Sequence, residues 1–150
     1  MNRSDTYIRH VHYYETDRMG IVHHSNYVRW MEEARIDYML RKGVDYAEIE
    51  ARQVLMTVTG VSCEYRRAPR FGDTIEIATR LVFFNGVRAV YSYEIYLAGE
   101  DALLAKGRSE HCFIDEESRR PLDLKKRMPD ISGIMLQITE ADPEPVRRRK

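Results

Sequence analysis

The sequence predicts an α+β fold, in which one long helix lies on a curved antiparallel sheet of about five strands. Several segments rich in Val, Ile, Thr and Tyr are separated by turn-forming residues, which is typical of β-strands. A single stretch instead repeats its apolar residues at helical spacing. The chain has 150 residues, a length typical of one domain that buries a single core.

The first segments are predicted to form a strand, a turn and the start of a helix. Residues 6–14 alternate loosely between polar and bulky side chains, as in a strand. Residues 15–20 form a turn-like run that ends at Gly20. Ser25 and Asn26 come shortly after it, and both residue types commonly cap the first turn of a helix.

The predicted helix runs from about Tyr27 to Lys42, and Gly43 ends it. Arg41 and Lys42 place positive charge at its C-terminus, where the helix dipole favours cations. At 1.5 Å per residue, such a helix is roughly 25 Å long. Residues 44–51 add a short helical turn. The apolar face is formed by Tyr27, Trp30, Met31, Ala34 and Tyr38.

Four further strands are predicted at 54–66, 74–84, 87–97 and 103–114. The Asn85-Gly86 pair between the second and third of them is the strongest hairpin signal in the chain. Because short connections favour antiparallel neighbours, we expect these four strands to pair in sequence order as a meander.

The part of the chain after residue 114 is predicted to be less regular. Asp115 opens an acidic turn, 115–118, and is expected to be solvated rather than catalytic. A short helix is predicted at about 124–128. Prolines interrupt residues 129–150, and the chain ends in the basic run 147–150. We therefore expect one domain over residues 1–150, with 129–150 as a tail.

The composition excludes several classes of protein. Lys and Arg number 24 and Asp and Glu number 24, and the pI of about 7.0 disfavours a general nucleic-acid binder. Hydrophobic residues make up 43%, too many for a disordered chain. No apolar run approaches the roughly 18 residues of a membrane span. The first residues lack the apolar core of a secretion signal. The sequence thus predicts a soluble cytoplasmic protein.

Neither a structural disulfide nor a metal site is expected. Cys63 and Cys112 lie far apart in the sequence, and a cytosolic chain of this size does not need a disulfide. His10 and His12 share one face of the first strand, but no third ligand follows at a suitable spacing. We therefore predict no metal and no cofactor.

The densest group of chemically able residues lies between Tyr13 and His24, just before the predicted helix. It contains Tyr14, Glu15, Asp17, His23 and His24. The unpaired amides at a helix start are donors for an incoming oxygen, and a carboxylate nearby supplies a base or nucleophile. This combination suits acyl transfer or hydrolysis. The alternative, that Asp17 is an ordinary helix cap, stays open at this point.

Two segments resemble a known family. The run from Tyr14 to Arg35, YETDRMGIVHHSNYVRWMEEAR, resembles the signature of hotdog-fold acyl-CoA thioesterases. Within that family it is similar to the branch of 4-hydroxybenzoyl-CoA thioesterase and the Tol-Pal-associated thioesterases. The run from Tyr65 to Asp73, YRRAPRFGD, resembles the family's second recurring segment. The predicted strand order also fits this fold, from about residue 6 to residue 127.

The resemblance implies a role for each residue of the first segment. Asp17 matches the catalytic aspartate, which acts as a nucleophile or as a general base. The backbone amides of His24 and Ser25 match the donors that polarise the thioester carbonyl. Tyr14 matches an aromatic residue near the site, and Gly20 matches the glycine that bends the loop. Arg18-Met19 stands where many members carry small residues, so the acyl group is not implied.

The resemblance also implies a substrate and an assembly. The substrate is an acyl-CoA, and arginine side chains suit its phosphates. The candidates on or beside strands are Arg66, Arg67, Arg70, Arg88 and Arg108. The family's site lies between subunits, so we expect a homodimer or a dimer of dimers (a homotetramer).

Two alternatives remain open. One is a hotdog dehydratase or hydratase with His24 as base, although no His-carboxylate pairing of that kind is evident. The other is a non-catalytic acyl-CoA-binding module, which would not need an ionised Asp17.

Overall fold

The computed structural model describes residues 5–140. The basic run 147–150 and the last two prolines, Pro143 and Pro145, lie outside this range. The elements in chain order are β1 (Tyr7–His10), the 3₁₀ turn η1 (Tyr13–Glu15), α1 (Ser25–Arg41), α2 (Tyr46–Ala51), β2 (Val54–Tyr65), β3 (Thr74–Phe84), β4 (Arg88–Leu97), β5 (Leu103–Asp115), α3 (Leu124–Arg127) and α4 (Pro129–Ile138).

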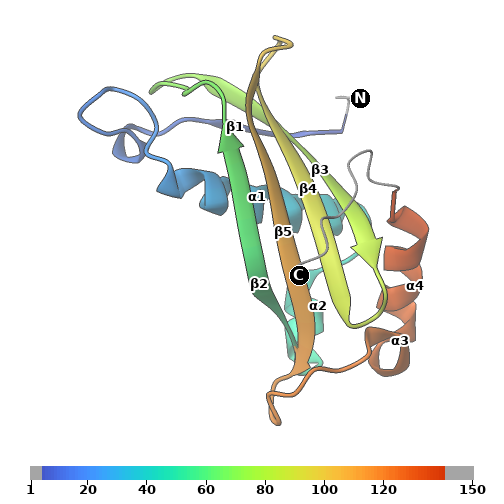
Figure 1. Cartoon of the computed structure of the whole chain (residues 1–150). Coiled ribbons are helices and arrows are strands. Elements are labelled where there is room, and N and C mark those ends of the chain that lie inside the picture. Colours follow the sequence, from blue (N-terminus) through green and yellow to red (C-terminus); the bar gives the residue numbers. More distant parts are fainter. Residues whose placement is uncertain (1–4, 141–150) are drawn as a thin grey trace.

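The described strands form one five-stranded antiparallel sheet in the order β1-β3-β4-β5-β2. The long helix α1 crosses one face of this sheet (Figure 1). Its 17 residues match the predicted length, and Gly43, with φ of +95°, follows its C-terminus as predicted. The predicted α+β fold, with a helix on a curved antiparallel sheet, is confirmed.

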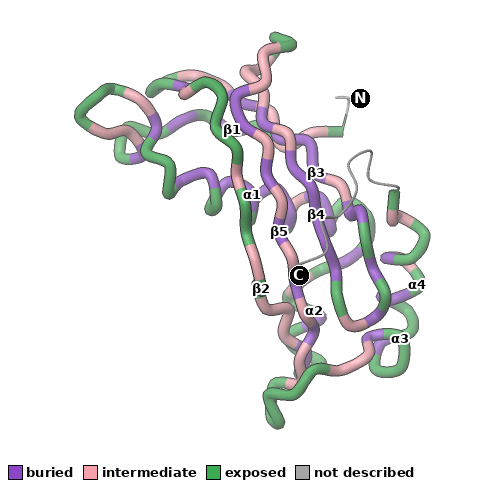
Figure 2. The backbone as a smooth tube through the Cα atoms, in the orientation of Figure 1, coloured by how far each residue is buried: buried purple, intermediate pink, exposed green. Residues whose placement is uncertain are grey.

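The predicted meander is wrong in one respect, which concerns β2. This strand pairs with β5 at the far edge of the sheet and not with β3, its neighbour in sequence. Residues 66–73 therefore cross the end of the sheet between β2 and β3. The strand β2 is also much less buried than β3 or β4 (Figure 2). Only β3, β4 and β5 follow one another as hairpins, because short turns join them.

The core lies between α1 and the sheet. The residues predicted for the apolar face of the helix are all buried: Tyr27, Trp30, Met31, Ala34 and Tyr38. The helix lies so close to β5 that a Cβ atom at Gly107 would be 2.2 Å from the Met31 sulfur. Glycine at position 107 thus allows the close approach of helix and sheet.

The N-terminal region differs from the prediction in two details. The strand predicted for 6–14 ends at His10, and Tyr13–Glu15 turn instead into the η1 segment. The helix begins at Ser25 with His24 as its N-cap, so the predicted caps Ser25 and Asn26 lie inside its first turn. The Asn26 side chain points back to the chain before the helix, where it bonds the carbonyls of Glu15 and His23.

The short helix α3 was predicted, whereas α4 was expected to be part of an irregular tail. Pro129 is the first residue of α4, a position where the missing N–H costs nothing. Ile131 and Met135 of α4 are buried in the core. No helix in residues 5–140 is both long enough and apolar enough to cross a membrane.

Candidate active site

The predicted site residues lie on the loop of residues 16–24, which joins η1 to α1. The loop closes on itself, because the Asp17 amide donates to the Ile21 carbonyl at 2.9 Å and the Gly20 amide to the Asp17 carbonyl at 3.0 Å. Gly20 has φ of +76°, a conformation that side chains disfavour. The predicted bend at Gly20 is therefore present.

Asp17 caps its own turn and not the helix. Its Oδ1 accepts the Met19 amide at 2.8 Å, an arrangement typical of an Asx turn. The helix-cap alternative considered from the sequence is wrong, since α1 begins at Ser25 with His24 as its N-cap. Asp17 is half-exposed, so its carboxylate is oriented by the backbone while still reaching solvent.

Two adjacent histidines lie at the start of α1. The Nδ1 atom of His23 lies 2.8 Å from the Ser25 hydroxyl and accepts the Ser25 amide at 3.3 Å. Because Nδ1 accepts this N–H, the neutral ring carries its proton on Nε2. The rings of His23 and His24 are 4.3 Å apart and both residues are exposed. The start of α1 is therefore exposed at the surface, with the Ser25 amide on His23 Nδ1 and the Asn26 amide on the His23 carbonyl.

The end of β2 lies against the start of α1. The Tyr65 ring lies 4.8 Å from Tyr27 and 6.4 Å from His24. Burial is the largest cause that raises the pKa of Tyr27 to about 12, and the nearby Cys63 and Tyr65 contribute to the same rise. Burial likewise raises the pKa of the Cys63 thiol. The thiol and the phenol are therefore protonated at neutral pH, so Cys63 is a poor nucleophile here.

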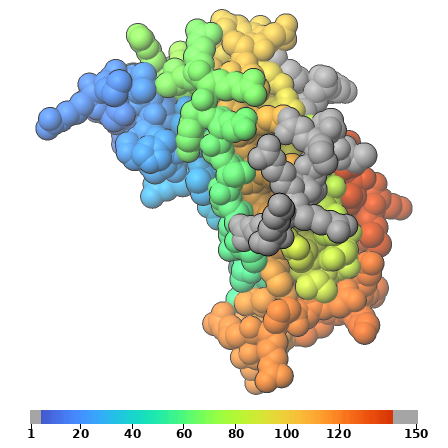
Figure 3. Space-filling model, in the orientation of Figure 1, coloured from blue at the N-terminus to red at the C-terminus, as the bar shows by residue number. Residues whose placement is uncertain are grey.

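The second segment of the resemblance lies beside the loop. The Val22 amide donates to the Pro69 carbonyl at 3.0 Å, and Ile21 forms an isolated bridge with Arg70. Asp73 accepts the Arg70 amide at 2.8 Å, which agrees with the turn-capping role of this residue type. In the space-filling view, the blue N-terminal segment and the green segment that holds the end of β2 form one continuous surface (Figure 3).

The candidate arginines divide into two places. Arg66 and Arg67 follow β2, where both amides donate to the Leu104 carbonyl, and their side chains are exposed, as is that of Arg70. Arg88 lies at the opposite end of the strands, because it pairs with Cys112 and, through β5, with Thr57. One protomer therefore does not bring Arg88 together with Arg66, Arg67 and Arg70.

Other candidates lie away from the loop. Tyr14 is 76% exposed and stacks on His12 on the outer surface. Asp115 accepts the Ser118 amide and pairs with Arg127. His10 contacts the Thr74 hydroxyl at 2.8 Å. Within residues 5–140, no three His, Cys, Asp or Glu side chains are grouped closely enough to hold a metal ion.

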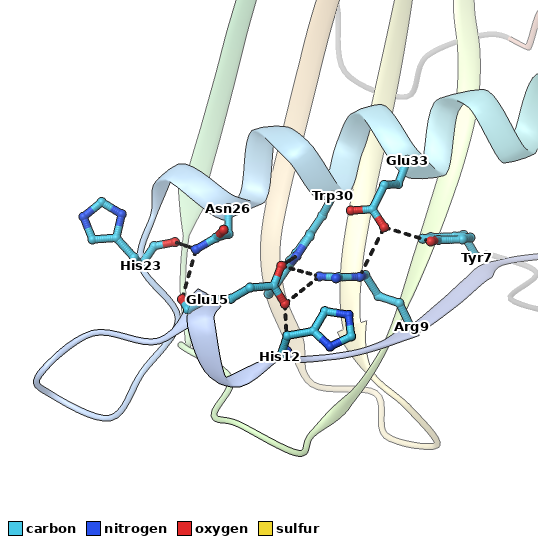
Figure 4. A network of polar contacts seen from close by, with 8 residues as sticks. All are labelled: Tyr7, Arg9, His12, Glu15, His23, Asn26, Trp30 and Glu33. Atoms are coloured by element: carbon cyan, nitrogen blue, oxygen red, sulfur yellow. Dashed lines mark hydrogen bonds and ion pairs between the residues drawn. The ribbon is translucent and has the colours of Figure 1, made fainter. Parts of the chain in front are cut away.

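The sequence did not single out the buried polar cluster beneath the loop. Figure 4 shows the Glu15 carboxylate at its centre, facing Arg9 and Trp30, with Asn26 bonding the Glu15 carbonyl. Glu15 is only 3% exposed. An acidic residue between aromatic and polar neighbours carries no pattern that distinguishes burial from exposure, and this is why its role was missed.

Comparison with known proteins identifies one family. Residues 11–137 match the family model described as thioesterase-like superfamily. A Bacillus subtilis protein named "Putative acyl-CoA thioesterase YneP" is 39% identical over 121 residues, which cover 80% of this chain and 86% of that protein. The acyl-CoA thioester hydrolase YbgC of Escherichia coli is 28% identical over 116 residues, covering 77% of this chain and 86% of YbgC.

Solved structures agree with these matches. A DHNA-CoA thioesterase from Staphylococcus aureus has a TM-score of 0.85 and 28% identity, with 89% of each chain covered. A hypothetical protein from Thermus thermophilus has a TM-score of 0.82 and 32% identity, with coverage of 89% of this chain and 98% of that one. The chain therefore belongs to the thioesterase-like superfamily, has its hotdog fold, and is an enzyme of the thioester hydrolase class.

Proposed function

We propose that this enzyme hydrolyses an acyl-CoA thioester to a free acid and CoA, with Asp17 as the catalytic carboxylate. One observation carries the assignment: a half-exposed carboxylate, oriented by the Met19 amide, lies on the loop that leads directly into the exposed start of α1. The names of relatives that act on acyl-CoA substrates support the same choice.

In the proposed mechanism, the amides of His24 and Ser25 donate to the carbonyl oxygen of the thioester, and for Ser25 this bond replaces its long 3.3 Å contact with His23 Nδ1. Negative charge grows on this oxygen as the carbonyl is attacked, and fixed N–H donors stabilise it. Asp17 either attacks the carbon itself or removes a proton from the attacking water. Along both routes a C–O bond forms, the C–S bond breaks, and water supplies the hydroxyl of the acid and the proton of the thiol.

The substrate's phosphates are assigned to the exposed arginines beside the loop. The exposed side chains of Arg66, Arg67 and Arg70 lie at the same end of the molecule as the loop 16–24. Guanidinium groups match phosphate oxygens in charge and geometry. Arg18 and Met19 are bulky and exposed on the loop itself, so they are the side chains there that would contact the acyl group.

We propose further that the active form is a homodimer or a dimer of dimers. Within residues 5–140, β2 pairs only with β5, so its other edge offers unpaired backbone groups. Val58, Val61 and Tyr65 of β2 are exposed although they are apolar or aromatic. A second copy of the chain would cover this edge and bring its own residues to the site.

The test is thiol release from a panel of aryl, short-chain and long-chain acyl-CoAs by the purified full chain. Release of CoA from at least one class is expected. A hydratase would instead add water to an enoyl-CoA without releasing thiol. A binding module would bind acyl-CoA and release nothing. Either of these two outcomes would replace the proposed function.

A further inference from the structure

The carboxylate of Glu15 is held by an unusually complete set of donors. The Arg9 Nη1 atom lies 3.0 Å and 2.8 Å from its two oxygens. The Trp30 indole N–H donates to Oε2 at 2.7 Å, and the His12 amide donates to Oε1 at 2.8 Å. Because Glu15 is 3% exposed, these protein groups replace the water that would otherwise surround its charge.

The backbone of Glu15 holds the far end of the same loop. Its carbonyl accepts the His23 amide at 2.8 Å and the Asn26 side-chain amide at 3.0 Å. Asn26 also donates to the His23 carbonyl at 3.1 Å. The two ends of the loop 16–24 are therefore joined at Glu15, as Figure 4 shows.

The part of the loop that carries Asp17 is otherwise held mainly by contacts within the loop, since the Asp17 amide donates to the Ile21 carbonyl and Thr16 forms an isolated bridge with Val22. Arg18, Met19 and Gly20 are exposed, and the Asp17 side chain bonds only to its own turn in the contacts that the structure gives. The contacts of Ile21 and Val22 with residues 69–70 hold the later half of the loop. The earlier half starts at Glu15, two residues before Asp17.

We propose that Glu15 is a positioning residue, which sets the place of Asp17 relative to the first amides of α1. This inference rests on the proposed function. The Glu15 carboxylate fixes the chain to β1 through Arg9 and to α1 through Trp30, while its carbonyl fixes the start of α1. A displacement of about 1 Å at a catalytic group can cost about 100-fold in rate, so this anchor matters for turnover.

The charge of Glu15 is needed as well as its shape. An amide side chain of the same size has one acceptor oxygen and an NH₂ group. Glu15→Gln would turn that NH₂ group toward Arg9 Nη1, or toward the N–H of Trp30 or of His12, and leave a buried donor unpaired. Glu33 offers a matched control. It contacts Tyr7 and Arg9 in the same network, and neither of these residues belongs to the loop 16–24.

The experiment compares Glu15→Gln with Glu33→Gln, each in the wild-type and in the Asp17→Asn background. Kinetic constants are measured by thiol release from the best acyl-CoA of the panel, and circular dichroism checks folding. Amide hydrogen exchange of residues 16–24 is measured in parallel, since it does not depend on activity. If Glu15→Gln does not fold, Asn26→Ala serves instead, because it removes the hydrogen bond from the Asn26 side chain to the Glu15 carbonyl.

Glu15→Gln is expected to lower kcat about tenfold or more with KM within twofold, whereas Glu33→Gln keeps kcat within about twofold. In the Asp17→Asn background, Glu15→Gln should add less than about a twofold loss, because it acts through Asp17. Exchange in the loop should be faster in Glu15→Gln than in Glu33→Gln. Asn26→Ala is expected to follow the same pattern with a smaller loss.

Different outcomes separate the two proposals. If Asp17→Asn keeps wild-type turnover, or no acyl-CoA is hydrolysed, the proposed function fails, and the exchange data alone decide the role of Glu15. If Asp17→Asn is inactive while Glu15→Gln keeps kcat, only the positioning role is overturned. The positioning role is also overturned if Glu15→Gln lowers kcat equally in both backgrounds, or if amide hydrogen exchange of residues 16–24 is unchanged.

Discussion

The ring of Tyr65, the last residue of β2, packs edge-on against the ring of Tyr27 in the first turn of α1, with centroids 4.8 Å apart. Tyr27 is buried, while half of Tyr65 stays exposed. This contact joins the edge of the sheet to the start of the helix. Residues that follow β2, among them Arg66 and Arg67, therefore emerge beside the proposed oxyanion site.

Asp17→Asn is expected to lower kcat about 100-fold or more and to leave CoA binding nearly unchanged, because the base or nucleophile is lost. Asparagine can still accept the Met19 amide, so the turn is kept. Asp73→Asn is the matched control, since the Asp73 carboxylate also accepts a backbone amide, that of Arg70, in a neighbouring turn. Steady-state thiol release measures both. Retention of more than about half of wild-type turnover in Asp17→Asn would show that the site is misassigned.

His24→Ala is expected to lower kcat less than Asp17→Asn does, because the backbone amide at position 24 remains. His10→Ala, at an exposed histidine on β1, is the control and should behave like the wild type. The comparison uses the same thiol-release assay. A larger loss at His24 than at Asp17 would instead favour a histidine base and the hydratase alternative.

Excess EDTA is expected to leave hydrolysis unchanged, because fixed amides stabilise the developing negative charge without a cation. Activity is measured before and after dialysis against the chelator, and again after addition of zinc or manganese. Loss of activity that either metal restores would contradict this mechanism. It would make His10, His12 and His23 candidate ligands.

Raising the salt concentration is expected to raise KM while kcat stays nearly level. The Debye length falls from about 10 Å at 0.1 M to about 3 Å at 1 M, so exposed contacts between phosphate and arginine weaken. Arg66→Gln should raise KM at low salt and reduce its salt dependence. Arg52→Gln, which removes an exposed partner of Asp130 far from the loop, is the control. A KM independent of salt would remove these arginines from the site.

The stability of the fold is expected to fall in acid through His111. Burial, with Arg35 as a second cause, lowers the pKa of His111 to about 3 from its usual 6.5. Below pH 6.5 the unfolded chain therefore binds a proton that the folded chain does not. Between pH 6.5 and 3 this group alone lowers the free energy of unfolding by about 1.4 kcal/mol per pH unit.

Urea unfolding at several pH values between 5 and 7 measures this effect. The free energy of unfolding of His111→Gln should depend less steeply on pH than that of the wild type. The difference in slope should correspond to the uptake of up to about one proton on unfolding. His10→Gln, at an exposed position, should keep the wild-type slope. Equal slopes in the wild type and His111→Gln would contradict the prediction.

Local patterns predicted most elements because they depend on neighbours in sequence. The Asn85-Gly86 turn joins β3 to β4 as expected, and the helical spacing from Tyr27 onward marks the buried face of α1. The place of β2 could not be predicted in this way. Its partner β5 lies far along the chain, with paired residues separated by 40 positions (Tyr65 and Ala105) to 61 positions (Val54 and Asp115), so no local pattern identifies the pairing.

The site was predictable to a similar extent. The resemblance pointed to the loop and to the segment 65–73, and the structure places these two beside each other. It did not predict that Arg88 lies at the other end of the strands, since distance along a strand requires the register. Glu15 was named among the chemically able residues, but its burial was not predicted, because a carboxylate looks the same in sequence whether it faces Arg9 or water.

The crossing segment 66–73 also bears on how the chain folds. Its first residues bond to Leu104 in β5, and its last bond to Val11 after β1, while the Pro69 carbonyl accepts the amide of Val22 in the loop. All of these pairs are distant in sequence, and closing such contacts is the slow part of folding. The loop 16–24 therefore reaches its final place only when both edges of the sheet are formed. If this loop holds the active site as proposed, a nascent or partly folded chain is inactive, and activity becomes a measure of complete folding.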